Sequence, residues 1–230
     1  MFVTFEGLDF SGKTTQARLL VEKLKSGRLP AEEAGRQHQA VRSDESVVVH
    51  FLREPGGTKI SERIREILLD NRWLEMSDLA EVLLFSASRT QLVSEVIMPA
   101  LQRGEIVVCD RFFDSTTAYQ GYGRGIDLDA IGNVNRIASL GLSPDVTLLI
   151  DIPVAEIEKR KSRAGLHFDR MEASGKGFYE RVRQGYLDIA RKESWRFVIV
   201  DGTLPVEEVE SLIWRAVERK VAGAMNRHTV

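Results

Sequence analysis

Near the start of the chain stand the residues Gly7-Leu8-Asp9-Phe10-Ser11-Gly12-Lys13-Thr14. They match the pattern G-x-x-x-x-G-K-[ST] at every defined position. A β-rich apolar run at residues 2–5 precedes them, and an amphipathic segment at residues 14–25 follows. Glycines in a turn between a strand and a helix let several backbone N–H groups converge on one anion. The stretch therefore predicts a phosphate-binding loop within a strand–loop–helix unit.

Each part of this loop has an expected task. The residues from Gly7 to Thr15 are expected to surround the phosphates of ATP, with the positive end of the following helix adding to the attraction. Lys13 should reach the β- and γ-phosphates, and the Thr14 hydroxyl should ligate Mg²⁺. The alternative is a glycine-rich turn with a surface lysine, which the flanking strand and helix disfavour. The loop alone names no reaction, because GTPase switches, motor ATPases and small-molecule kinases all use one.

Short apolar runs alternate with longer amphipathic stretches along the rest of the chain. Strands are predicted at residues 2–5, 47–52, 106–109, 146–150 and 197–200, and helices at 14–25, 60–68, 79–101, 154–163, 177–191 and 206–221. Strands that are apolar throughout are buried on both faces, as in a parallel sheet flanked by helices. We therefore predict one α/β domain over residues 1–230, a P-loop NTPase fold with a doubly wound, five-stranded parallel sheet. Its ligands should lie beyond the carboxyl ends of the strands.

Several features of the sequence limit the possible classes of protein. The formal net charge of −2 gives no global field to attract nucleic acid or an anionic membrane. The single cysteine, Cys109, rules out an internal disulfide framework and fits a reducing cytoplasm. The chain has no signal-peptide pattern, no run of eighteen apolar residues, and no histidine spacing that suggests zinc. Residues 26–46 are polar and without a sustained period, and are interpreted as a solvated insertion.

Six blocks of sequence extend the argument beyond the phosphate loop. They are GLD at 7–9, REPGGT at 53–58, LFSASR at 84–89, DRF at 110–112, STTAYQG at 115–121 and DRME at 169–172. In this order, and over nearly the whole chain, they resemble bacterial thymidylate kinases. The resemblance implies transfer of the γ-phosphoryl group of ATP to thymidine 5′-monophosphate (dTMP), giving dTDP for dTTP synthesis. It also implies a homodimer, for which the apolar helix at 79–101 is the candidate interface.

The resemblance assigns the thymine base to two residues on one helix. Phe85 and Arg89 lie four residues apart, so their side chains share a face. In the family the phenylalanine stacks on the base, a contact worth about 1–3 kcal/mol, and the arginine bonds the base edge. On the sequence alone a phenylalanine such as Phe85 more often belongs to the core than to a base-binding site, but Arg89 favours the binding role, because an arginine on an apolar helix needs an acceptor. Thr116 is expected to meet the N3 or O2 edge of thymine.

The sugar and phosphates are assigned in the same way. Asp9 is expected to accept a hydrogen bond from the 3′-hydroxyl, and Tyr119 to lie where a 2′-hydroxyl would clash. Arg111 should bridge the acceptor phosphate and the transferring phosphoryl group, a task that suits a planar, bidentate donor. Arg53 is the second candidate for the acceptor phosphate. Asp110 is expected to hold a magnesium-bound water.

A basic segment at residues 160–165 resembles the lid that closes over ATP in the family, and the whole lid is placed at about 158–172. Some family members carry a catalytic arginine in the phosphate loop directly after the aspartate, where this chain has Phe10. The lid must then supply that charge, with Arg163 as the first candidate and Arg160 as the second. The alternative is a solvated, basic helix end.

Two other functions stay open at this stage. The nearest is a kinase for another nucleoside or deoxynucleoside monophosphate, which the motifs around Phe85 and Tyr119 disfavour but do not exclude. The other is a regulatory GTPase switch. That class requires an N-K-x-D guanine motif and a glycine three residues after the aspartate of the third strand. The chain lacks the motif and has Phe113 at that position.

Overall fold

The computed structural model describes residues 1–26, 47–164 and 175–225. The predicted insertion at 26–46 and the second part of the predicted lid therefore lie almost entirely outside the described residues. Within the described part, no helix is both long and apolar enough to cross a bilayer.

Five parallel strands form the centre of the fold. They are β1 (Phe2–Glu6), β2 (Val49–Arg53), β3 (Ile106–Asp110), β4 (Val146–Asp151) and β5 (Phe197–Asp201), in the sheet order β2-β3-β1-β4-β5. The chain moves outward from β1 in both directions, so the sheet is doubly wound, as predicted. Strand β2 starts two residues later than expected, because Val47 and Val48 are exposed. The carboxyl ends of β1 and β3 meet beside the phosphate loop.

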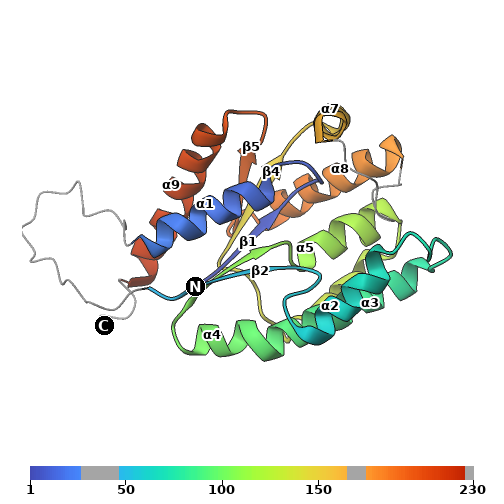
Figure 1. The fold of residues 1–230 in the computed structure, drawn as a ribbon, viewed down its shortest axis with the longest axis horizontal. Coiled ribbons are helices and arrows are strands. Elements are labelled where there is room, and N and C mark those ends of the chain that lie inside the picture. The colour runs from blue at the N-terminus through green and yellow to red at the C-terminus, as the bar shows by residue number, and fades with distance from the viewer. Residues whose placement is uncertain (27–46, 165–174, 226–230) are drawn as a thin grey trace, which may run out of the picture.

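Helices cover both faces of the sheet (Figure 1). They are α1 (Lys13–Lys25), α2 (Lys59–Leu69), α3 (Asp78–Leu92), α4 (Met98–Gln102), α5 (Phe113–Thr116), α6 (Leu128–Ala138), α7 (Val154–Ala164), α8 (Lys176–Lys192) and α9 (Val206–Met225), with π-helical turns η1 (Val93–Ile97) and η2 (Thr117–Gly123). Alternate residues of the central strands enter different cores. Val3 and Val108 pack with α1 and α9, whereas Phe2 and Val107 pack with the end of α3, η1 and α4.

The predicted helix at 79–101 is helical throughout but is not one regular α-helix. Its π-helical turn η1 immediately precedes α4, where Pro99 stands near the start. A proline inside a helix lacks the N–H donor and its ring clashes with the carbonyl four residues earlier, which accounts for the irregular turn. This helix, the candidate dimer interface, is only partly exposed in the single chain. Leu79 and Leu83 are exposed, but Leu92, Val93 and Ile97 are buried against the sheet.

The region from α5 to α6 is helical, although the sequence pattern did not predict it. Residues 113–123 have no apolar period, because their buried positions include polar side chains such as Asp114, Thr116 and Gln120. Asp114 is held by Arg196 through two hydrogen bonds of 2.7 Å, and Gln120 donates to Glu81 at 2.8 Å. Ion pairs and hydrogen bonds, rather than a regular apolar face, therefore hold this segment in position beside the carboxyl ends of the strands.

Candidate active site

The phosphate loop has the backbone that its glycines permit. Gly7 has φ +136° and Gly12 has φ +97°, values that favour glycine. A Cβ atom at Gly7 would lie 2.4 Å from the carbonyl oxygen of Ile150 on β4, so the start of the loop is also packed too closely for any side chain. Helix α1 begins at Lys13, directly after Gly12, and points its N-terminal N–H groups toward the loop.

Lys13 lies over this loop with little solvent contact. Its side-chain Nζ donates a hydrogen bond of 2.6 Å to the carbonyl oxygen of Leu8. Burial, with the nearby positive charge of Arg111, lowers the pKa of Lys13 to about 8, although Asp9 and Asp110 oppose that shift. An entering phosphate would supply the negative charge that favours the ammonium form.

Thr14 and Asp110 meet at the mouth of the loop. The Thr14 hydroxyl donates a hydrogen bond to the Asp110 carboxylate, which brings a residue of α1 to the end of β3. Hydroxyl, carboxylate and water oxygens are the ligands that Mg²⁺ prefers. These two residues therefore fit the predicted metal site by ligand type and by proximity.

Two cavities adjoin at the carboxyl ends of the strands. The first, here called the loop cavity, is lined by phosphate-loop and basic side chains, among them Lys13, Thr14, Arg18, Arg53 and Asp110. The second, the aromatic cavity, is lined by Phe85, Arg89, Thr116, Tyr119 and Gln120, among others. Four residues line both cavities: Asp9, Glu54, Arg65 and Arg111. The two cavities therefore share a wall rich in charged groups.

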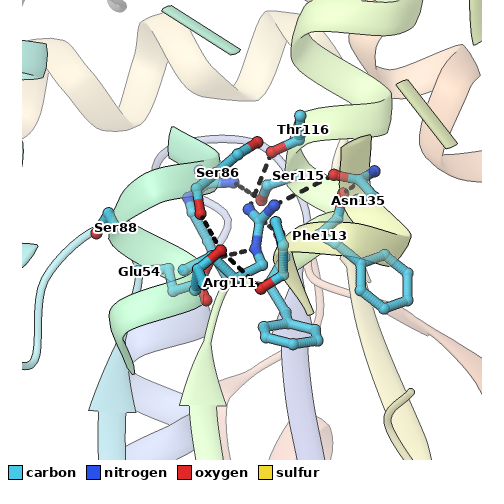
Figure 2. Close-up of polar contacts among 12 residues, drawn as sticks. Glu54, Ser86, Ser88, Arg111, Phe113, Ser115, Thr116 and Asn135 are labelled. Atoms are coloured by element: carbon cyan, nitrogen blue, oxygen red, sulfur yellow. Dashed lines mark hydrogen bonds and ion pairs between the residues drawn. The ribbon is translucent and has the colours of Figure 1, made fainter. Parts of the chain in front are cut away.

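The guanidinium of Arg89 is held from several directions. Figure 2 draws the polar contacts of this region, with Glu54 and Asn135 on opposite sides. The guanidinium donates to Glu54 at 2.8 Å, to Asn135 at 3.2 Å, to Thr116 at 2.9 Å and to the carbonyl of Phe112 at 3.4 Å. Among the described residues these contacts engage four of its five N–H donors, which leaves one on Nη1 for a ligand. The acceptors that a buried arginine requires are thus mainly within the protein.

Glu54 is the acidic partner of this arginine. Its side chain is almost fully buried, and its Oε1 has no hydrogen-bond partner in the described part of the chain. Burial raises the pKa of Glu54 to about 7, against the opposing charge of Arg89. No sequence pattern singles out Glu54, because its partner, Arg89, stands 35 residues further along the chain.

Phe85 is half-buried and forms part of the wall of the aromatic cavity. It packs beside the cluster of α8, η2 and β4 side chains that includes Tyr119 and Phe178. Its ring is therefore available to a flat ligand, which favours the binding role over the core role that the sequence left open.

Arg111 lies at the centre of the shared wall. Its backbone is left-handed, with φ +72°, and its Nη2 donates to Asp9 at 2.6 Å and to the Tyr119 hydroxyl at 3.2 Å. Burial alone would raise the pKa of Asp9, but the charges of Arg111 and Lys13 outweigh burial and lower it. The three predicted residues Asp9, Arg111 and Tyr119 are thus brought into one contact group.

The remaining predicted arginines differ in their surroundings. Arg53 lines the loop cavity only and pairs with Glu62 at 3.1 Å, with both side chains largely exposed. Arg160 donates to the carbonyls of Phe10 at 3.1 Å and Gly202 at 2.7 Å, so α7 is fastened to the phosphate loop. The backbone of Arg163 lies in α7, but its side chain is outside the described part.

Three further residues of the site carried no motif signal that the sequence analysis used. Arg65 of α2 lines both cavities and donates to the carbonyl of Pro55 at 2.9 Å. Glu6 and Tyr186, from β1 and α8, contact each other at 2.9 Å behind Arg111. Glu6 stands directly before the phosphate loop, as the last residue of β1 and one residue beyond the strand predicted at 2–5.

The fold has a doubly wound parallel sheet and a phosphate loop with its lysine, and a second cavity shares Arg111 with the first. Together these features define a P-loop kinase that acts on a small phosphorylated molecule. A family model described as Thymidylate kinase matches residues 37–213. The chain is 43% identical to a thymidylate kinase of Pelotomaculum thermopropionicum over 94% of this chain and 92% of the relative. It is also 43% identical to one of Caldanaerobacter subterraneus over 97% of both chains.

A solved structure gives the same result. The crystal structure of thymidylate kinase from Ehrlichia chaffeensis matches with a TM-score of 0.71 and 34% sequence identity, over 95% of this chain and 98% of that one. The chain belongs to the thymidylate kinase family. The predicted family and the predicted α/β fold are both confirmed.

Proposed function

We propose that the two adjoining cavities hold ATP and dTMP, and that the chain transfers the γ-phosphoryl group of the first to the phosphate of the second, giving dTDP for dTTP synthesis. Phosphorylation of dTMP is the activity of the family, and the similarity extends over nearly the full length of this chain. The observation that supports the residue assignment best is the shared wall, where Asp9 and Arg111 face both cavities.

The loop cavity is the proposed ATP site. The backbone from Gly7 to Gly12, the amine of Lys13 and the start of α1 would bind the phosphates. Thr14 and Asp110 would hold Mg²⁺, directly or through water. A bound Mg²⁺ supplies positive charge that offsets the charge of the phosphate oxygens.

The aromatic cavity is the proposed dTMP site. Phe85 would stack on thymine, while Thr116 and the remaining N–H of Arg89 would reach the base edge. Thr116 accepts from Arg89, so its own hydroxyl hydrogen is directed elsewhere and can donate to a ligand. Asp9 and Tyr119 would lie along the sugar, as the family resemblance predicts.

Transfer itself needs no protein base, because the acceptor is already an anionic phosphate oxygen. Catalysis then consists of alignment and charge stabilisation, which Lys13 and Arg111 would supply. Arg53 and Arg65 are the candidates for holding the acceptor phosphate, and Arg163 is proposed as the lid arginine. Closure of the lid would exclude water, which otherwise hydrolyses ATP.

A coupled assay tests this function. Purified protein with ATP and Mg²⁺ should convert dTMP fastest in a panel of nucleoside monophosphates. One methyl group distinguishes thymine from uracil, a difference worth about 1–3 kcal/mol, so dUMP should be a slower substrate rather than an inert one. No conversion of any deoxypyrimidine monophosphate would overturn the proposal, and a faster purine substrate would favour the alternative kinase.

We further propose that two copies of the chain associate through α2. Its isoleucine stripe, Ile60, Ile64 and Ile67, has the periodicity of a core face, yet Ile60 and Ile67 are 55% and 45% exposed. The stripe lines a shallow groove on α2, and α2 packs against α3, where Leu79 and Leu83 are also exposed. An apolar stripe left uncovered on a helix supports an interface with a second copy.

A further inference from the structure

The two terminal nitrogens of the Arg111 guanidinium, Nη1 and Nη2, have different hydrogen-bond partners and form the two ends of the group. Nη2 contacts Asp9 and Tyr119, the residues proposed to lie along the sugar. Nη1 contacts the Ser115 hydroxyl at 3.0 Å and the Tyr186 hydroxyl at 3.1 Å, as well as the Gly7 carbonyl at 3.1 Å. The first end therefore contacts the residues proposed to lie along the sugar, and the second end contacts two hydroxyls, of which that of Tyr186 is buried and that of Ser115 belongs to a residue that also lines the aromatic cavity.

Behind the second end lies the carboxylate of Glu6, which has no solvent exposure. Its Oε2 accepts hydrogen bonds from the Ser115 hydroxyl at 2.6 Å and from the Tyr186 hydroxyl at 2.9 Å. A hydroxyl that donates its one hydrogen to Glu6 turns its lone pairs outward, and here they face Nη1 of Arg111. The acid thus sets the direction of both hydroxyls, and the hydroxyls hold the guanidinium.

Glu6 also fixes the backbone that carries the arginine. Its Oε1 accepts from the backbone N–H of Phe112 at 2.8 Å and of Ser115 at 3.3 Å, at the start of α5. Phe112 is the N-cap residue of that helix and has no side-chain acceptor of its own, so Glu6 satisfies the Phe112 N–H, while the Ser115 N–H also donates to the Phe112 carbonyl at 3.1 Å. Arg111 precedes this turn in a left-handed conformation that a non-glycine residue adopts only when its surroundings hold it.

We infer that Glu6, Ser115 and Tyr186 are positioning residues, which anchor the inner end of the Arg111 guanidinium while its outer end serves the transferring phosphoryl group. Binding of dTMP would draw Asp9 and Tyr119 toward the sugar and free Nη2, but the inner contacts would persist. The inference rests on the proposed function, because it assigns a task to the same arginine. It adds a buried acid on β1 and a tyrosine on α8, neither of which lines the two cavities, as residues that act on the reaction through Arg111.

The inference is tested with Tyr186→Phe, which removes one hydroxyl and keeps the ring. We expect kcat to fall about tenfold, the effect of one hydrogen bond lost in the transition state, with KM for dTMP within about twofold of wild type. Ser115→Ala should act in the same direction. Tyr122→Phe is the matched control, since that half-buried hydroxyl makes no hydrogen bond within the described residues, and its kcat should equal that of wild type.

A double-mutant cycle separates positioning from general support of the fold. If Tyr186 acts through Arg111, then Tyr186→Phe should lower the residual kcat of an Arg111→Lys enzyme by less than about twofold. The same tenfold loss in both backgrounds would overturn the inference, as would wild-type kcat in both Tyr186→Phe and Ser115→Ala. Should Tyr186→Phe fail to fold, Ser115→Ala replaces it in the cycle. A wild-type enzyme inactive on dTMP would instead refute the proposed function.

Discussion

The Glu54 carboxylate lies 2.8 Å from Nε of Arg89, and both side chains are at most 4% exposed. The pair joins the residue directly after β2 to the last turn of α3, and it orients the arginine proposed to recognise thymine. Neither residue could be buried alone at acceptable cost, because each would leave a polar group without its partner. Stability and the proposed recognition of the base therefore rest on the same contact.

Glu54→Ala should destabilise the fold and weaken dTMP binding together. Removing one partner of a buried pair costs about 3–5 kcal/mol, and a freed Arg89 would lose its fixed direction. Chemical denaturation and calorimetric titration with dTMP measure the two effects. Glu66→Gln, in an exposed pair with Arg63, should leave both unchanged. Normal dTMP affinity in a folded Glu54→Ala protein would show that Glu54 does not orient Arg89.

The raised pKa of Glu54 predicts that the stability of the fold depends on pH. The folded-state pKa of Glu54 is about 7, above its usual value of 4.5, so between these values the folded chain binds more protons than the unfolded one. The contribution of Glu54 to stability is then fully present below about pH 4.5 and is lost as the pH rises through 7, by up to about 1.4 kcal/mol per pH unit. The free energy of unfolding of wild type, minus that of Glu54→Gln, should decrease from pH 5 to pH 7. A constant difference would contradict this.

Lys13→Ala should abolish phosphoryl transfer while the fold remains. The amine contacts only the loop carbonyl of Leu8 by hydrogen bond in the described structure, so its loss removes charge from the phosphate site rather than packing from the core. Turnover in the coupled assay and the thermal midpoint from circular dichroism measure the two properties. Lys25→Ala, at the exposed end of the same helix, is the control. Near-normal turnover of Lys13→Ala would remove the phosphate loop from the mechanism.

Phe85→Ala should weaken dTMP binding by about 1–3 kcal/mol, the value of one base–aromatic stack. The affinity for ATP should not change, because Phe85 lines the aromatic cavity and not the loop cavity. Calorimetric titration of each nucleotide gives both numbers with one protein. Unchanged dTMP affinity would mean that thymine stacks elsewhere.

Ile60→Asp combined with Ile67→Asp should convert a dimer into a monomer. Both positions are exposed in the single chain, so the charges cost little there, but an interface would bury them without partners. Sedimentation velocity or light scattering reads the assembly state directly. Exposed Ile137 on α6 provides the matched control, as Ile137→Asp adds a charge outside α2. An unchanged dimer would place the interface elsewhere.

The sequence predicted those parts of the molecule whose signal is local. The phosphate loop follows from eight consecutive residues, and the strands follow from short apolar runs such as residues 106–109. The helical segment 113–123 was missed because polar contacts between distant segments bury it, as Arg196 does for Asp114. The partners of Arg89 were equally hidden, since Glu54 and Asn135 stand 35 and 46 residues away along the chain. The isoleucine stripe of α2 predicted the helix correctly, but only the structure reveals that it faces outward.

The close approach of Gly7 to the Ile150 carbonyl has a consequence for how the protein can change over time. Because any side chain at position 7 would push β4 away from β1, even alanine would disturb the central sheet and the nucleotide site at once. Substitution is therefore sterically closed at this position, whereas Phe10, only three residues away, is half-buried and carries a large side chain. A change at Gly7 would thus be felt by the fold and by nucleotide binding together.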